Sequence, residues 1–179
     1  IRAMKPATPQ SMQTPPRIVI LGAGFAALTA VRELRKRAPK ARITLVAPKA
    51  EFVYLPSLIW IPSGLRRGAD LILPLGRFLK DHDVEFIQGR VTGLSDGGRV
   101  VLTDNGPVEN DALLIATGGR FIKKLPGIEH ALTLCEGVPA AEAIRDRVEA
   151  MQSGRIALGF GGNPDRKSTR LNSSHDQNS

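Results

Sequence analysis

The fold is decided by residues 17–27, which read RIVILGAGFAA. The β-branched apolar run of residues 17–21 predicts a short strand. Residues 25–37 carry apolar side chains with the spacing of one helix face, which predicts a helix directly after the glycines. Between these two elements the sequence fits the pattern G-x-G-x-x-G/A, which has physical meaning only in that position. The segment therefore predicts the phosphate-binding turn of a dinucleotide-binding fold.

Each small residue of this turn has its own role. Gly22 permits the tight turn, Gly24 lets a diphosphate approach the backbone, and Ala27 lets the helix pack closely on the strand. Free N–H groups at the helix N-terminus then attract the phosphate charge. A glycine-rich turn without a ligand is the alternative, and the flanking strand and helix disfavour it. The predicted cofactor-binding turn comprises Gly22, Ala23, Gly24, Phe25, Ala26 and Ala27.

The end of the next predicted strand departs from the usual pattern. Residues 42–46 complete a β-α-β unit, which implies a right-handed parallel crossover. An acidic residue is normally expected at the tip of this strand, where it binds the ribose 2′-OH. Ala47 stands in that place, Lys49 follows shortly after, and the first acid is Glu51. Either Glu51 reaches back to the ribose or the backbone holds it.

The remaining pattern predicts an α/β domain with a parallel sheet and an inserted antiparallel meander. A continuous apolar run at residues 112–116 indicates a strand buried on both faces. The other expected elements are a short helix over 73–81, a strand over 84–88, meander strands over 91–94, 99–103 and 108–109, a helix over 139–153 and a strand over 155–160.

Composition excludes several classes. The net charge of +8 suits an acidic partner, but aromatic residues make up only 4% and no reading helix is evident, so we do not expect nucleic-acid binding. Cys135 is the one cysteine, so no internal disulfide forms, and no Cys/His cluster has metal-ligand spacing. No apolar run approaches the ~18 residues of a membrane helix and no signal peptide is evident, which favours a cytoplasmic protein.

The two ends of the chain differ from its middle. Residues 1–16 are rich in proline and polar residues and read as a disordered lead-in. Residues 165–179 are almost entirely polar and resemble one reading frame of a short-read sequencing adapter, which indicates a non-native tail on a truncated reading frame. We therefore expect a dinucleotide-binding domain over 17–154, followed by the first strand of a truncated second domain over 155–164.

The combined motifs resemble a known class of flavoproteins. Residues 17–27, the meander, and the segment DALLIATGG at 111–119 resemble the FAD-binding domain of glutathione-reductase-like proteins, the pyridine nucleotide-disulfide oxidoreductase class. Residues 52–60, FVYLPSLIW, and residues 133–136, TLCE, are similar to the sulfide:quinone oxidoreductase branch, which includes the flavin subunit of flavocytochrome c sulfide dehydrogenase. The resemblance covers residues 17–164 and identifies the chain as an N-terminal fragment.

That resemblance implies FAD as cofactor and assigns further site residues. It implies that Val91 offers its backbone to the adenine, that Pro56 lies near the isoalloxazine, and that Cys135 is the catalytic residue near the flavin. Taken alone, a single cysteine is more often a small buried apolar side chain, and the partner cysteines of the family's sulfur relay are absent from this sequence. The remaining implied cofactor-binding residues are Ala47, Ala116, Thr117 and Gly118.

The resemblance also implies a function. The full-length protein is expected to be an FAD-dependent oxidoreductase that passes electrons from a reduced donor, such as sulfide, to a quinone. The fragment alone is expected to be inactive. Peripheral membrane contact through the missing C-terminal part and a homo-oligomer are compatible with this interpretation. The alternatives are an NAD(P)H-dependent FAD oxidoreductase of the type II NADH dehydrogenase kind and a non-catalytic dinucleotide-binding module.

Overall fold

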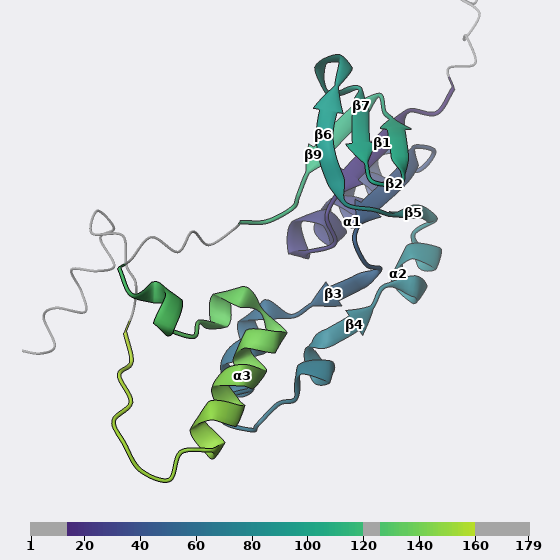
Figure 1. Ribbon diagram of the computed structural model, residues 1–179. Coiled ribbons are helices and arrows are strands. Elements are labelled where there is room, and N and C mark those ends of the chain that lie inside the picture. The colour runs from purple at the N-terminus through teal and green to yellow at the C-terminus, as the bar shows by residue number, and fades with distance from the viewer. Residues whose placement is uncertain (1–13, 120–125, 160–179) are drawn as a thin grey trace, which may run out of the picture.

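The computed structural model describes residues 14–119 and 126–159. Its centre is a parallel sheet in the order β5-β2-β1-β9 (Figure 1). The strands are β1 (Arg17–Leu21), β2 (Arg42–Ala47), β5 (Val84–Gln88) and β9 (Ala112–Ile115). All three neighbouring pairs run parallel, so the carboxyl ends of the four strands lie at one edge of the sheet. The α/β class and the parallel crossover predicted from the sequence are confirmed.

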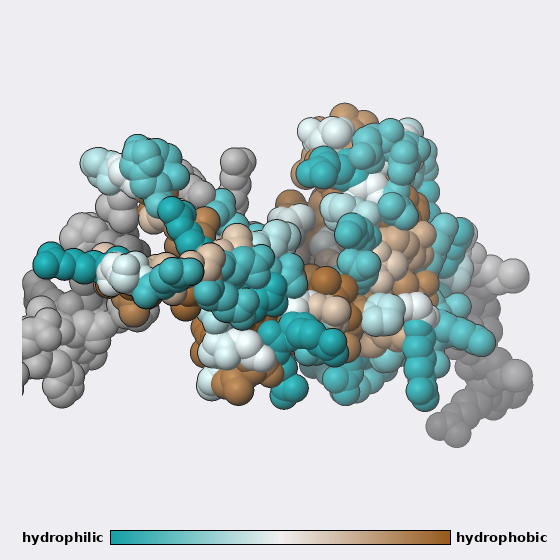
Figure 2. All heavy atoms as spheres, turned by 60° about the horizontal axis from the view of Figure 1, so that its bottom comes forward, coloured by the Kyte–Doolittle hydropathy of each residue, from teal (hydrophilic) through white to brown (hydrophobic). Residues whose placement is uncertain are grey.

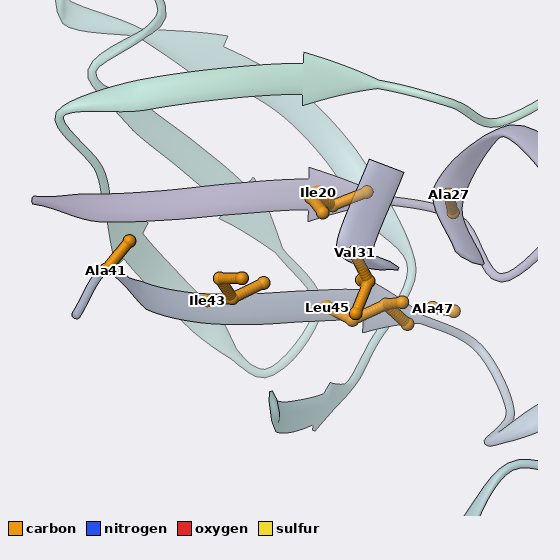
Figure 3. Close-up of a cluster of buried hydrophobic side chains, with 7 residues drawn as sticks. All are labelled: Ile20, Ala27, Val31, Ala41, Ile43, Leu45 and Ala47. Carbon is orange, nitrogen blue, oxygen red and sulfur yellow. The ribbon is translucent and has the colours of Figure 1, made fainter. Parts of the chain in front are cut away.

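Helix α1 (Phe25–Arg37) packs on this sheet through its apolar face. Ala27 and Val31 are completely buried, and they lie against Ile20 of β1 and Leu45 of β2 (Figure 3). The small size of Ala27 allows the first turn of the helix to approach the strand closely, as the motif requires. The resulting core fixes the direction in which the helix N-terminus points.

The basic residues at the C-terminal end of α1 stabilise the fold. Arg35 donates hydrogen bonds to the carbonyl groups of His82 and Asp83, and also to those of Pro39 and Ala41, at 2.7–2.9 Å. Lys36 and Arg37 form ion pairs with Glu33 one turn earlier, at 2.8 and 3.6 Å. Cations also suit the negative end of the helix dipole.

Two small antiparallel sheets accompany the parallel one. The meander consists of β6 (Val91–Ser95), β7 (Val100–Thr103) and β8 (Gly106–Glu109), and Val101 is its fully buried contact with the main sheet. The other sheet pairs β3 (Glu51–Val53) with β4 (Ile72–Pro74), which leads into α2 (Gly76–Asp81). The predicted meander is confirmed, and the short helix begins three residues later than expected because Ile72–Pro74 form a strand.

A separate group of helices lies beyond β3 and β4, at the opposite end of the molecule from the meander (Figure 1). Helix α3 (Val138–Glu149) packs there through Ala141 against Leu58, Ile61 and Leu71, which are all buried. The short 3-10 helices here are η1 (Leu55–Trp60), η2 (Gly68–Leu71), η4 (Ile128–His130) and η5 (Leu134–Glu136), while η3 (Asp96–Gly98) belongs to the meander.

Two sequence predictions about buried or paired strands are wrong. Strand β9 is not buried on both faces: Leu114 and Ile115 are 37% and 60% exposed, because β1 is its one partner among the described residues. Residues 155–159 form no strand, and Leu158 is 93% exposed, since no described strand offers a ladder to join. Predictions for residues 1–13 and 160–179 lie outside the described residues.

Candidate functional site

A groove of about 530 Å³ lies at the carboxyl edge of the parallel sheet. Parallel α/β sheets bind ligands in this position, outside the ends of their strands. The glycine turn, the end of β2, the start of β3 and the start of β6 all contribute to its wall. The lining residues are Gly22, Ala23, Gly24, Val46, Ala47, Pro48, Lys49, Glu51, Val53, Leu55, Gly89, Arg90, Val91 and Thr117.

The two glycines of the turn meet different surroundings. Gly22 has φ +107°, and a Cβ there would overlap the carbonyl of Ala116, with the carbonyl carbon only 2.9 Å away. The protein's own packing therefore requires glycine at position 22. Gly24 has an ordinary extended backbone, with φ −86° and ψ −172°, and a Cβ there would meet no atom within 4 Å. No packing contact of the protein excludes a side chain at position 24, and the groove in front of it is free for a close approach.

The groove wall beside Gly24 carries the start of α1. No side chain caps this helix and its first turn holds no acidic residue. The first backbone N–H groups of an α-helix have no partner within the helix. Together with the helix dipole they offer an anion a set of donors and a positive partial charge. This end of the groove is suited to phosphate.

The end of β2 carries backbone carbonyls that already have partners. Val46 accepts a hydrogen bond from the N–H of Gly22 at 2.8 Å, and Ala47 accepts one from the N–H of Gly89 at 3.0 Å. Ala47 is 3% exposed although it lines the groove. Further along, Lys49 and Glu51 form an ion pair with Nζ and Oε2 3.8 Å apart. Charged groups of both signs therefore occupy this end of the groove.

The residues after β9 complete the groove on the other side. Thr117 lines the groove. Ala116 lies behind Gly22, and the N–H of Ala116 donates a hydrogen bond to the carbonyl oxygen of Leu21 at 2.9 Å. Gly118 follows with φ +75°, a left-handed conformation that favours glycine. Val91, the first residue of β6, lines the groove as well. Of the four predicted positions, Thr117 and Val91 line the groove, Ala116 lies directly behind its glycine turn, and Gly118 is outside the lining.

Sequence reasoning missed Gly89 and Arg90, which connect β5 to the meander. Gly89 is buried, and a Cβ there would lie 3.2 Å from Oδ1 of Asp104. The N–H of Arg90 donates to that same oxygen at 2.7 Å. The signal was a glycine at a strand end, at the carboxyl edge where the predicted ligand lies.

Four other predicted site residues lie outside the groove lining. Ala27 is buried beneath the turn, and Ala26 is exposed beside it. Phe25 is 52% exposed and meets the ring of Phe52 edge to face, with centroids 4.8 Å apart. Pro56 is exposed in η1, next to Leu55, which does line the groove.

Cys135 lies in η5, outside the groove lining and close to α3. Its thiol is exposed, and its N–H donates to Oγ1 of Thr133 at 3.3 Å. The alternative of a small buried side chain is therefore wrong. Within residues 14–119 and 126–159, no group of three or more His, Cys, Asp or Glu side chains is arranged to hold a metal ion.

The strongest electrostatic cluster lies at the opposite edge of the sheet. Arg17 donates to Asp111 at 3.0 Å and to Glu109 at 2.7 Å, and its backbone N–H donates to Asp111 at 2.8 Å. The side-chain and backbone hydrogen bonds from Arg17 lower the pKa of Asp111 to about 2. The same contacts raise the pKa of Arg17 further above its usual range. This cluster joins β1 to the start of β9 and stabilises the sheet.

The chain is similar in sequence to a known protein family and to several known proteins. The family described as pyridine nucleotide-disulphide oxidoreductase matches residues 16–158. The chain is 28% identical over 127 residues to the sulfide-quinone reductase of Aquifex aeolicus, covering 70% of this chain and 30% of that protein. It is 31% identical over 138 residues to the type II NADH:quinone oxidoreductase of Staphylococcus aureus, covering 72% and 33%.

Solved structures agree with these sequence relatives. The sulfide:quinone oxidoreductase from Aquifex aeolicus superimposes with a TM-score of 0.69 at 26% identity, over 75% of this chain and 32% of that one. NDH2 from Plasmodium falciparum shares the fold, with a TM-score of 0.61 at 19% identity, over 73% of this chain and 28% of that one. The chain thus spans about a third of the length of the curated relatives it matches.

Proposed function

This chain belongs to the pyridine nucleotide-disulphide oxidoreductase family, and from that premise we propose that it is the FAD-binding part of an oxidoreductase that passes electrons from sulfide to a quinone. One observation carries the cofactor assignment. Gly24 faces free space at the groove although nothing in the protein requires glycine there. A diphosphate held against the backbone explains both features, since any side chain at position 24 would stand in its place.

Different residues of the groove are suited to hold different parts of FAD. In this proposal the first turn of α1 would hold the diphosphate, the wall formed by Lys49, Glu51 and Val91 would receive the adenosine, and Thr117 would lie on the flavin side; the groove lining, which contains all four of these residues, supports it. The bound flavin supplies the two-electron chemistry, while the protein binds, orients and tunes it. Leu55 of η1 lines the groove and Pro56 is its neighbour, so these two residues would lie nearest the flavin end if FAD binds as proposed.

Two observations bear on the electron donor. The exposed thiol of Cys135 is accessible to a small sulfur donor, and a relative named sulfide-quinone reductase favours sulfide. A relative at 31% identity is named type II NADH:quinone oxidoreductase, which makes NADH the second candidate. Quinone reduction by the complete oxidoreductase, measured with sulfide and with NADH as donor, separates the two.

An exposed apolar surface supports contact with the membrane that holds the quinone. Leu55, Ile59, Trp60 and Leu65 are 45–66% exposed, and Arg66 lies beside them. Figure 2, which brings the bottom of Figure 1 forward, shows brown apolar patches between hydrophilic side chains. Tryptophan and arginine suit the lipid-water interface. Within the described part of the chain no helix is long and apolar enough to cross a membrane.

The cofactor proposal is tested by flavin selectivity. The purified chain is mixed with FAD, FMN or riboflavin and passed through a desalting column, and the yellow colour that elutes with the protein is measured. We expect retention of FAD alone, because FMN and riboflavin lack the adenosine diphosphate that the groove is suited to hold. Equal retention of FMN and FAD contradicts the proposal.

A further inference from the structure

We infer that the turn between β7 and β8, residues 104–106, clamps one wall of the groove in the position that a nucleotide needs, with Asp104 and Asn105 as positioning residues. Neither of these two residues lines the groove. The inference rests on the proposed function and deepens it, because it names side chains outside the groove that decide how tightly the groove binds.

The turn is joined to the connection between β5 and β6 by three hydrogen bonds (Figure 1). Oδ1 of Asp104 accepts the N–H of Arg90 at 2.7 Å, and the N–H of Asp104 donates to the carbonyl of Arg90 at 3.1 Å. Nδ2 of Asn105 donates to the carbonyl of Gln88 at 2.7 Å. The side chains of Asp104 and Asn105 therefore bond to residues 14 and 17 positions away in the chain.

The hairpin turn itself does not need these two side chains. Asp and Asn are common in turns because they tolerate a left-handed backbone and bond to their own turn. Here Gly106, with φ +116°, is the one residue of 104–106 with a positive φ. Oγ1 of Thr103 accepts the N–H of Asn105 at 3.1 Å and donates to the carbonyl of Gly106 at 2.7 Å. Thr103 and Gly106 therefore form the turn, and Asp104 and Asn105 hold the connection to β6.

The connection is held from both sides. The N–H of Gly89 donates to the carbonyl of Ala47, at the end of β2, at 3.0 Å. Gly89 is buried, and a Cβ there would lie only 3.2 Å from Oδ1 of Asp104, so glycine lets the turn approach this closely. The next two residues, Arg90 and Val91, line the groove. The clamp thus fixes this wall between the end of β2 and the meander.

A wall that is fixed before the ligand arrives favours binding. Ordering the backbone of one flexible residue costs a ligand about tenfold in affinity. In the wild-type chain the clamp orders residues 89–91 during folding, so the ligand does not bear this cost. Without the carboxylate of Asp104, the N–H of Arg90 loses its partner and the ligand has to order the wall as it binds.

The test measures nucleotide affinity and local order in five forms of the chain: the wild type, Asp104→Ala, Asp104→Asn, Asn105→Ala and the control Asp96→Ala. Dissociation constants for ADP are measured by calorimetry, amide hydrogen exchange of residues 89–91 without ligand, and stability by urea unfolding. Asp96 lies in η3, the other turn of the meander, outside the groove lining. Its φ of +50° disfavours alanine, so the control destabilises the meander without touching the clamp.

We expect Asp104→Ala to bind ADP about tenfold more weakly than the wild type and to exchange the amides of residues 89–91 about tenfold faster. Asn105→Ala weakens ADP binding by about fivefold, because its hydrogen bond is neutral. Asp104→Asn keeps the wild-type affinity, since its amide oxygen still accepts the N–H of Arg90. Asp96→Ala keeps the wild-type affinity in spite of a lower urea midpoint.

Three results overturn the inference alone: wild-type ADP affinity in both Asp104→Ala and Asn105→Ala, an equal loss in Asp104→Asn and Asp104→Ala, or an equal loss in Asp96→Ala and Asp104→Ala. The second would make charge the cause, and the third would make it the stability of the meander. Absence of ADP and FAD binding by the wild type overturns the proposed function, and the exchange rates then still decide whether the turn holds the wall.

Discussion

The substitution Gly24→Ala separates ligand binding from folding. A Cβ at Gly24 meets no protein atom within 4 Å, and the φ of −86° suits any residue. The expected cost is that of replacing glycine at a helix N-cap by alanine, less than about 1 kcal/mol of unfolding free energy. The same methyl group stands where the diphosphate approaches the amides. Loss of one charge-assisted hydrogen bond, about 1.5–3 kcal/mol, weakens FAD binding by about 10- to 150-fold.

The matched control is Gly22→Ala, two residues earlier in the same turn. Its φ of +107° disfavours any side chain, and its Cβ would overlap the Ala116 carbonyl. Backbone strain alone costs about 1–3 kcal/mol, so urea unfolding must show clear destabilisation. Gly24→Val is expected to follow Gly24→Ala with a larger loss of FAD. The assays are FAD fluorescence titration and urea unfolding of each variant. Wild-type FAD affinity in Gly24→Ala would refute the reasoning, because the free space in front of Gly24 would then have no ligand.

Three further predictions address the fold and the thiol. Replacing Arg35 by methionine removes its hydrogen bonds to four backbone carbonyls and is expected to lower the unfolding free energy by about 1.5–3 kcal/mol, measured by urea unfolding. The pKa of Asp111 is about 2 in the folded chain, against about 3.9 when unfolded. Its pairing with Arg17 therefore stabilises the fold fully above pH 4 and less as the pH falls towards 2, and an NMR titration midpoint near 4 would contradict this. Cys135 is exposed, so a thiol reagent should label the native chain as fast as the urea-unfolded chain, and protection in the native chain would contradict the exposed position.

The sequence predicts well those features that depend on local pattern. The bounds of β1 and α1 follow from the β-branched apolar run, from the helical spacing of the apolar side chains and from the glycine turn between them, and the structure has the same residues in both elements. The meander is also predicted from local signals, because Asp96-Gly97-Gly98 and Asp104-Asn105-Gly106 mark the turns between its strands. These signals act within a few residues of the chain.

Features that depend on distant partners were predicted poorly. The run of residues 112–116 has the composition of a buried strand, but burial is decided by what lies on either side of it, and β9 has one strand partner among the described residues. The same holds for residues 155–159, which have the composition of a strand without a ladder to join. Gly89 and Arg90 contribute to the groove through the connection from β5 to β6; the glycine at the end of β5 is visible in the sequence, but its position beside the glycine turn depends on how the distant strands pair.

The groove also explains why one motif cannot be interpreted residue by residue from sequence. Gly22 and Gly24 are the same residue type in G-x-G, but a side chain at position 22 would clash with the carbonyl of Ala116, whereas a Cβ at position 24 would meet no protein atom within 4 Å. A turn that only connected a strand to a helix would need the first glycine and not the second. Because no contact inside the protein excludes a side chain at position 24, the presence of glycine at the mouth of a groove that α1 makes attractive to anions is best explained by a ligand that occupies the space.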